Sequence, residues 1–281
     1  MSVAGADPNG DGPVPATVVL LSTRERARTL VRQAFPRRRT HLVLARGLRD
    51  FAAAFHKQLV DVALVDLGAP TDDTSGAIEL AREYPSAPFV GLTPLRPTDA
   101  SLVARCAASE FADIAVESVD DAVLRDLVLP LGFTARFAEA LREPPASLGL
   151  DTPLRQQAWR ALVAHGGRPV LTESLAGALG ITREHLSRAF SAGEHAPNIK
   201  RVIDLVRLLA AAELSKNPGY DVADVARVLG FASSSHLSTT AQRIVGTRPT
   251  SLARLRAVDL VERFGQGRSR SRRSVRPRSS H

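Results

Sequence analysis

The stretch VARVLGFASSSHLSTTAQRIVGTRP, residues 225–249, repeats the pattern of LAGALGITREHLSRAF at residues 175–190. In both, a short apolar run precedes Leu-Gly, then a small or hydroxyl residue, and then His-Leu-Ser. Glycine ends a helix at little cost because it adopts the left-handed conformation, and a hydroxyl side chain caps the helix that follows. Each stretch therefore predicts two short helices joined by a glycine turn, which is a helix-turn-helix. We name the unit at residues 172–190 the first head and the unit at residues 221–245 the second head.

Between the heads lies NIKRVIDLVRLLAAAELSKNPG, residues 198–219, with apolar residues at the i, i+3, i+4, i+7 spacing of one long helix. The predicted helix caps are Thr172, Thr182, Asp221 and Ser233, and the predicted turns are Gly180 and Gly230. A spacer of about 18 helical residues is about 27 Å long. With the width of the side chains, this length brings the heads close to one turn of duplex DNA, about 34 Å apart. The repeat thus predicts two heads in successive major grooves.

Charge is divided unequally along the chain of 281 residues. Residues 1–150 hold 16 basic and 19 acidic side chains, a net charge of −3, whereas residues 151–281 hold 21 and 10, a net charge of +11. A basic half joined to a mildly acidic half favours a polyanion-binding module. The one cysteine, Cys106, excludes an intrachain disulfide. The lack of a long apolar run and of a signal-peptide layout predicts a cytoplasmic protein without membrane contact.

The first half alternates apolar strands with amphipathic helices. The predicted strands are Thr17–Ser22, Thr40–Ala45, Val60–Gly68, Ala87–Thr93 and Ala112–Val116. This alternation predicts an α/β doubly wound, five-stranded parallel sheet, and the second half predicts an all-α double helix-turn-helix domain. The predicted boundaries are a disordered arm at 1–16, the sheet domain with its closing helix at 17–143, a linker at 144–153, the double helix-turn-helix domain at 154–264 and a disordered basic tail at 265–281.

Two features of the sequence leave alternatives open. Phe133, Phe137 and Leu141 form an apolar stripe that either docks a second subunit or closes the core of the sheet domain. The arginines of the basic tail either add non-specific affinity for phosphate or stay in solvent.

The region from Pro153 to Arg256 resembles the DNA-binding domain of bacterial AraC/XylS-type transcription regulators. The most specific matches to that family lie in the second head, at Val225-Ala226, Gly230-Phe231, Gly246 and Pro249. By this resemblance the second helix of each head presents DNA-contacting residues, which are Arg183, Glu184, Ser187 and Arg188 in the first head and Ser234, Ser235, Ser238 and Thr239 in the second. Arginine suits guanine and glutamate suits cytosine, whereas short hydroxyls bond phosphates or base edges with little discrimination. We therefore expect the first head to carry most of the sequence specificity and the second head mainly to position the domain on the DNA.

VDVALVDLGAP, residues 60–70, resembles the third strand and following loop of a response-regulator receiver domain, in which a strand-end Asp accepts phosphate. Asp66 and Pro70 match that pattern, and Thr93 matches the switch hydroxyl of the fourth strand. Ser22 and Thr23 replace the acidic pair that holds Mg²⁺ in receivers, and the lysine expected after the fifth strand is missing. We therefore interpret residues 17–143 as a CheY-like pseudo-receiver that is not phosphorylated at Asp66.

Together these patterns predict a transcription regulator that binds double-stranded DNA sequence-specifically, with the first domain serving in homodimerisation or partner sensing. One alternative is a phosphorylation-controlled response regulator that uses Asp66, with Glu25, Asp72 or Asp73 holding the metal. The other alternative is a decayed DNA-binding domain that binds RNA polymerase or another regulator. The sequence holds no nucleophile–base arrangement and no glycine-rich phosphate loop, and no further ligand accompanies the repeated His185 and His236. We therefore expect no enzyme activity, cofactor or metal.

Overall fold

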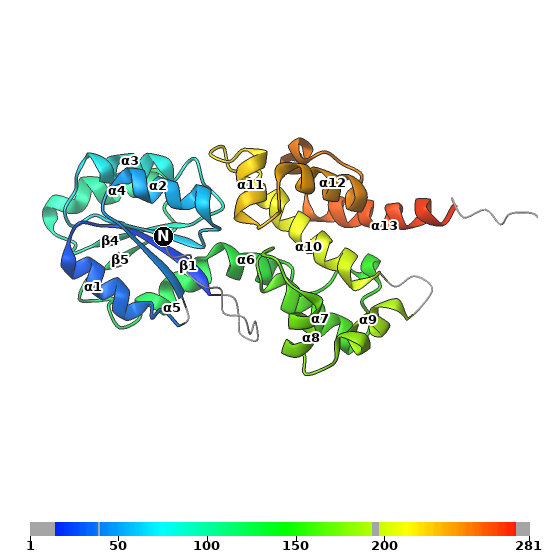
Figure 1. Cartoon of the computed structure of the whole chain (residues 1–281). Helices are drawn as coiled ribbons and strands as arrows, with labels where there is room; N and C mark the ends of the chain where they lie inside the picture. Colours follow the sequence, from blue (N-terminus) through cyan, green and yellow to red (C-terminus); the bar gives the residue numbers. More distant parts are fainter. Residues whose placement is uncertain (1–14, 39, 193–196, 274–281) are drawn as a thin grey trace, which may run out of the picture.

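The computed structural model describes residues 15–38, 40–192 and 197–273 (Figure 1). The strands are β1 (Ala16–Leu21), β2 (Thr40–Ala45), β3 (Val62–Asp66), β4 (Phe89–Thr93) and β5 (Asp113–Val116). The helices of the first half are α1 (Glu25–Ala34), α2 (Leu48–Lys57), α3 (Asp72–Leu80), α4 (Ala100–Ala108), α5 (Leu124–Val128) and α6 (Phe133–Ala140). Those of the second half are α7 (Pro153–Val163), α8 (Thr172–Ala178), α9 (Arg183–Ser191), α10 (Ile199–Leu214), α11 (Val222–Val228), α12 (Ser234–Val245) and α13 (Ala257–Arg273).

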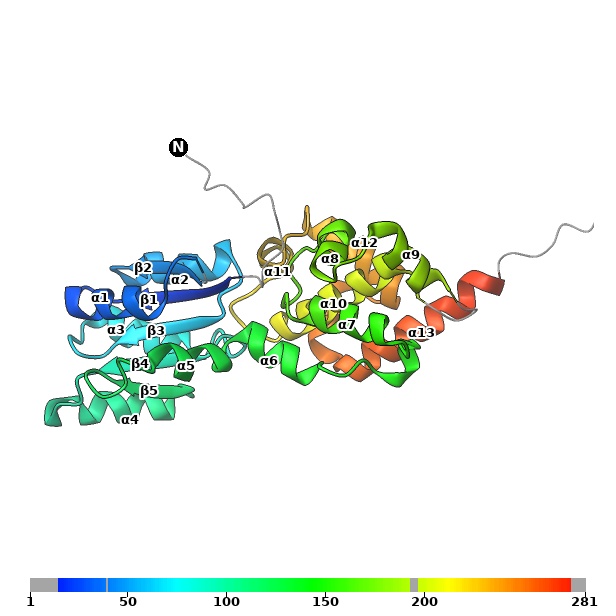
Figure 2. The same ribbon diagram turned by 90° about the horizontal axis from the view of Figure 1, so that it is seen from below.

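The five strands form one parallel sheet in the order β2-β1-β3-β4-β5. Side chains alternate across a strand, so β1 serves both faces. Val18 and Leu20 pack with α1 and α5, whereas Val19 and Leu21 pack with α2, α3 and α4. The two views show these helix layers on opposite faces of the sheet (Figures 1 and 2). The predicted doubly wound fold is confirmed, and its strand order is the one described for CheY-like proteins.

The second half is helical and is organised around α10 (Figure 1). This helix contacts both heads, and Val202, Leu205 and Leu208 on it are fully buried. It has 16 residues, against the 18 predicted, and is therefore about 24 Å long. The predicted arrangement of one central helix between two helix pairs is thus present in a slightly shorter form.

The apolar stripe after Pro130 has a different role from both roles predicted for it. Phe133 and Phe137 of α6 stack with their ring centroids 5.7 Å apart, and both are buried in the core of the helical half. Leu148 and Leu150, inside the predicted linker 144–153, are buried in the same core. The segment between the halves is therefore packed structure that joins the sheet domain to the helical domain.

A buried carboxylate fixes this junction. Asp61, 1% exposed, lies between the sheet and the helical half. Its Oδ2 is 2.7 Å from Arg168 Nη2 and accepts the N–H of Thr17 at 2.8 Å, while its Oδ1 accepts the N–H of Thr134 at 3.0 Å. A buried charge is tolerated only when it is paired and hydrogen-bonded, so these partners hold the two halves in one orientation.

The C-terminal helix is longer than predicted. Helix α13 continues to Arg273, beyond the predicted end of the domain at 264 and into the segment predicted as a disordered tail. The rest of that predicted tail, 274–281, lies outside the described residues, as does most of the predicted arm at 1–16. Within the described part of the chain, no helix is both long and apolar enough to cross a membrane.

Candidate nucleic-acid interface and Asp66 site

Each head is a pair of helices joined at a left-handed glycine. Gly180, with φ +67°, separates α8 from α9, and Gly230, with φ +64°, separates α11 from α12. Three predicted caps are confirmed, because the side chains of Thr182, Asp221 and Ser233 each accept the backbone N–H three residues on. The fourth prediction is wrong by one residue: Leu171 is the N-cap of α8, and Thr172 is its first helical residue.

The predicted DNA-contacting residues lie on the second helix of each head. In the first head, Arg183, Glu184 and Arg188 are exposed on α9 and Ser187 is half-buried. Glu184 and Arg188 are four residues apart, so they lie on one face of the helix. The buried Leu186 and Phe190 anchor the opposite face of α9 in the core. Helix α9 therefore presents a charged surface of both signs from a fixed backbone.

Two of the four predicted hydroxyl groups of the second head already donate within their own helix. Ser235 and Thr239 are exposed on α12, and Ser234 and Ser238 are half-buried. The hydroxyl of Ser238 donates to the carbonyl of Ser234 at 2.9 Å, and that of Thr239 donates to the carbonyl of Ser235 at 2.9 Å. A hydroxyl that donates within its own helix keeps only its lone pairs for a partner. These two side chains can therefore accept from the amino groups of adenine and cytosine but do not donate to phosphate in this conformation.

Two arginines that the sequence analysis did not single out fix the heads to the core. The guanidinium of Arg155 donates to the carbonyls of Ala189 (2.9 Å) and Ala192 at the C-terminal end of α9. That of Arg207 donates to the carbonyl of Leu229 (3.0 Å) and lies 3.8 Å from the ring centroid of Phe231. A signal was present for Arg155, because it falls in the apolar stripe of α7 with Ala158, Trp159 and Leu162.

The two turns allow a matched stability test, in which Gly230→Ala is expected to destabilise the chain more than Gly180→Ala. A left-handed alanine costs about 1–2 kcal/mol at either position. At Gly230 the new Cβ would also lie 2.7 Å from Pro169 Cγ, whereas at Gly180 it would meet no described heavy atom within 4 Å beyond its chain neighbours. Thermal unfolding of both variants measures the difference, and equal shifts of the midpoint would show that Pro169 does not constrain the second turn.

The second head also contacts the sheet domain. His56 Nδ1 of α2 lies 3.1 Å from Asp224 Oδ1 of α11, and the hydroxyl of Tyr220 donates to the carbonyl of Phe55 at 3.1 Å. Burial opposes ionisation of Asp224, but the hydrogen bonds of His56 and of the Asp221 N–H hold the pKa of this carboxyl below its ordinary value. Asn217 adds two hydrogen bonds to Ser86, of 2.9 Å and 2.7 Å. The first helix of the second head is thus docked on the sheet domain.

At the carboxyl edge of the sheet, an arginine of the chain itself occupies the Asp66 site. Arg24 Nε lies 3.0 and 2.9 Å from the two oxygens of Asp66, and Arg24 Nη2 bonds both Asp66 Oδ1 and Glu117 Oε1. Both carboxylates are buried. Burial opposes the charged form of Arg24, but the hydrogen bonds with Asp66 and Glu117 raise the pKa of its guanidinium above the ordinary value. Asp66 also accepts the hydroxyl of Ser22 at 2.5 Å and the N–H of Gly68 at 2.9 Å.

The acids considered for a metal do not complete a site with Asp66. Glu25 bonds Arg32 at 2.6 Å with its side chain 64% exposed, and Asp72 is exposed at the start of α3. Asp73 and Asp66 line a cavity of about 10 Å³, which holds about one water molecule. Among the residues that the structure describes, no three His, Cys, Asp or Glu side chains gather closely enough to hold a metal ion. The cation beside Asp66 is the guanidinium of Arg24.

Comparison with known proteins bears on the helical half. Residues 175–254 match the family model of the helix-turn-helix domain. No curated protein matches the chain. Among solved structures, full-length FixJ from B. japonicum is 12% identical with a TM-score of 0.38, covering 77% of this chain and 97% of that chain. The family match confirms the AraC-type resemblance, so the chain is a DNA-binding helix-turn-helix transcription regulator, and its own parallel sheet forms a receiver-like N-terminal domain.

Proposed function

We propose that the chain regulates transcription by binding duplex DNA sequence-specifically, with its two heads in successive major grooves. The observation that carries the proposal is the duplicated geometry: two helix pairs, each turned at a left-handed glycine, are held on one rigid central helix. The helical half also carries the net positive charge that phosphate binding needs.

The two heads contribute unequally to sequence recognition. Arg188 and Glu184 can form the arginine–guanine and glutamate–cytosine contacts that discriminate bases. Short hydroxyls discriminate little between bases, and in α12 those of Ser238 and Thr239 offer acceptors only, so the second head contributes mainly position and register.

Selection from a random duplex library with the full chain tests this function. At about physiological salt, the dissociation constant for non-specific DNA is about 10⁻⁴–10⁻⁶ M. Enrichment of particular duplexes under this condition therefore measures sequence-specific binding. We expect two enriched elements about one helical turn apart, with the stronger preference in the element bound by the first head. No enrichment by a folded chain would instead favour a decayed domain that binds RNA polymerase or another regulator.

The receiver-like domain works without phosphorylation in this proposal. Arg24 supplies an internal cation to Asp66 and occupies the space beside its oxygens. We expect no mass increase when the chain is incubated with acetyl phosphate and Mg²⁺ and then analysed by intact mass spectrometry. A stoichiometric phosphoryl gain that disappears in Asp66→Asn would overturn this proposal and establish the phosphorylation-controlled alternative.

Of the two roles considered for this domain, the contacts support sensing more than homodimerisation. The apolar stripe that suggested a second subunit is buried within the chain, at Phe133 and Phe137. By contrast, the pair of His56 with Asp224 and the bonds of Asn217 link the domain directly to the second head. A change in the sheet domain therefore has a physical route to the DNA-binding half.

A further inference from the structure

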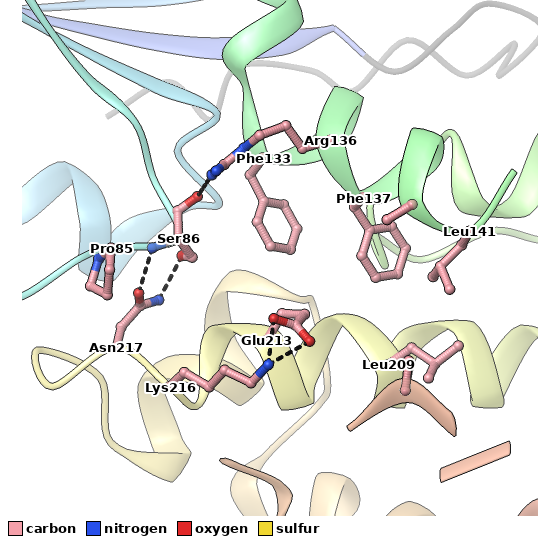
Figure 3. Close-up of a pocket in the computed structure, with 12 residues that line it drawn as sticks. Pro85, Ser86, Phe133, Arg136, Phe137, Leu141, Leu209, Glu213, Lys216 and Asn217 are labelled. Carbon is pink, nitrogen blue, oxygen red and sulfur yellow. Dashed lines mark hydrogen bonds and ion pairs between the residues drawn. The ribbon is translucent and has the colours of Figure 1, made fainter. Parts of the chain in front are cut away.

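A cavity of about 420 Å³ lies between the two halves of the chain (Figure 3). Its walls come from the Pro85–Ser86 loop of the sheet domain, from α6, from the C-terminal half of α10 and from the start of α13. Phe133, Phe137, Leu141 and Leu209 are among its apolar lining residues. Small-molecule sites are of this kind, about 300–1,000 Å³, mostly apolar and placed at domain junctions.

The charged groups of this cavity leave an excess of positive charge. Arg136 donates to the carbonyl of Ser86 at 2.7 Å, and that neutral acceptor does not compensate its charge. Lys216 Nζ lies 2.7 Å from both oxygens of Glu213, so this pair is neutral as a unit. The lining therefore combines an apolar body with a net charge of about +1 from its three ionisable side chains, Arg136, Lys216 and Glu213, which favours an anionic group on a ligand.

We propose that this cavity binds a small amphipathic carboxylate. Its apolar part lies against Phe133, Phe137 and Leu209, and its carboxylate binds Arg136 at the polar end, where Lys216 is also within the lining. The carboxylate gives Arg136 the anionic partner that Ser86 does not supply, and the apolar body packs against the apolar side chains that line the cavity (Figure 3).

The position of the cavity makes the ligand a regulator. Ser86 and Asn217 line it and also form two of the hydrogen bonds between the halves. A ligand that binds Arg136 competes with its bond to the Ser86 carbonyl and so acts on that junction. An effect of the ligand on DNA affinity rests on the proposed function. The coupling is reciprocal, because a ligand that changes DNA affinity by a given factor must bind the DNA complex with its own affinity changed by the same factor.

Fluorescence of 8-anilinonaphthalene-1-sulfonate, an anionic aromatic probe, tests the site on the full chain. We expect saturable binding that octanoate displaces and octylamine does not. Ala140→Trp fills the cavity and should weaken probe binding about tenfold or more. Ala135→Trp, exposed on the same helix and outside the lining, is the matched control and should leave it within about twofold.

Equal probe affinity in the two tryptophan variants, or equal displacement by octylamine and octanoate, would overturn the site. Binding of the selected duplex is measured separately, with and without octanoate. If the library yields no enriched duplex while the probe results stand, the proposed function fails and the ligand site does not. If DNA binds but probe affinity is the same in both variants, the ligand site fails and DNA binding does not.

Discussion

The Arg24→Met variant is expected to lose about 3–5 kcal/mol of the free energy of unfolding, the usual effect of removing one partner from a buried ion group. Methionine keeps the length of the side chain but removes the guanidinium. Asp66, with its side chain 3% exposed, would then lose this cation, and Glu117, 2% exposed, would keep only the exposed Arg26, whose Nε lies 3.5 Å from its Oε2. Urea unfolding followed by circular dichroism measures the loss.

Two companion variants make the result specific. Arg32→Met removes an exposed arginine that bonds Glu25 on the same segment, and it should change stability little because exposed pairs are screened by solvent. Adding Glu117→Gln to Arg24→Met should recover part of the loss, since it removes one of the two buried carboxylates that Arg24 paired with. If Arg24→Met unfolds like the Arg32→Met control, Arg24 is not the internal cation of this site.

Arg188→Ala is expected to weaken binding to the selected duplex about ten- to hundredfold, since one bidentate arginine–guanine contact discriminates by about 1–3 kcal/mol. The side chain is exposed on α9, whose C-terminal end is fixed by Arg155. The preference for a particular base should weaken at one base pair of the first element and persist at the others. Fluorescence anisotropy on the selected duplex, and on duplexes with each base pair of the first element replaced, measures both effects.

Ser235→Ala is the matched change in the second head. It removes one hydroxyl from α12, the helix that in the proposal mainly positions the chain on the duplex. We therefore expect a smaller loss of DNA affinity than in Arg188→Ala, and the same loss for every duplex sequence. The opposite result, with base preference intact in Arg188→Ala and abolished in Ser235→Ala, would reverse the roles of the heads.

Local patterns predicted most of the fold because they depend on near neighbours in the chain. Alternating apolar strands located all five members of the sheet, and the glycine turns with the caps at Thr182, Asp221 and Ser233 located both helix pairs. Thr172 was placed wrongly as a cap because it begins α8 directly after Leu171, a difference of one residue at a helix end. Such ends depend on details that residue type alone does not determine.

Contacts between distant segments could not be predicted from the sequence. The stripe of Phe133 and Phe137 has an amphipathic pattern, but periodicity does not say which core receives it. Likewise, the sequence showed that the receiver acids are missing, but not that Arg24 would reach both Asp66 and Glu117. In the chain, Asp66 lies 42 positions after Arg24 and Glu117 lies 93 positions after it. The parallel sheet brings the three residues to one edge.

Simultaneous binding of both heads to DNA is tested most directly by inserting about 5 base pairs, half a turn of B-DNA, between the two selected elements. Helix α10 holds the heads in one orientation, so the second element would face away from its head. Because linking two binding units raises affinity by about 10²–10⁴-fold, the insertion is predicted to lower the affinity of the full chain by a factor in that range. Unchanged affinity for the lengthened duplex would contradict simultaneous binding of both heads.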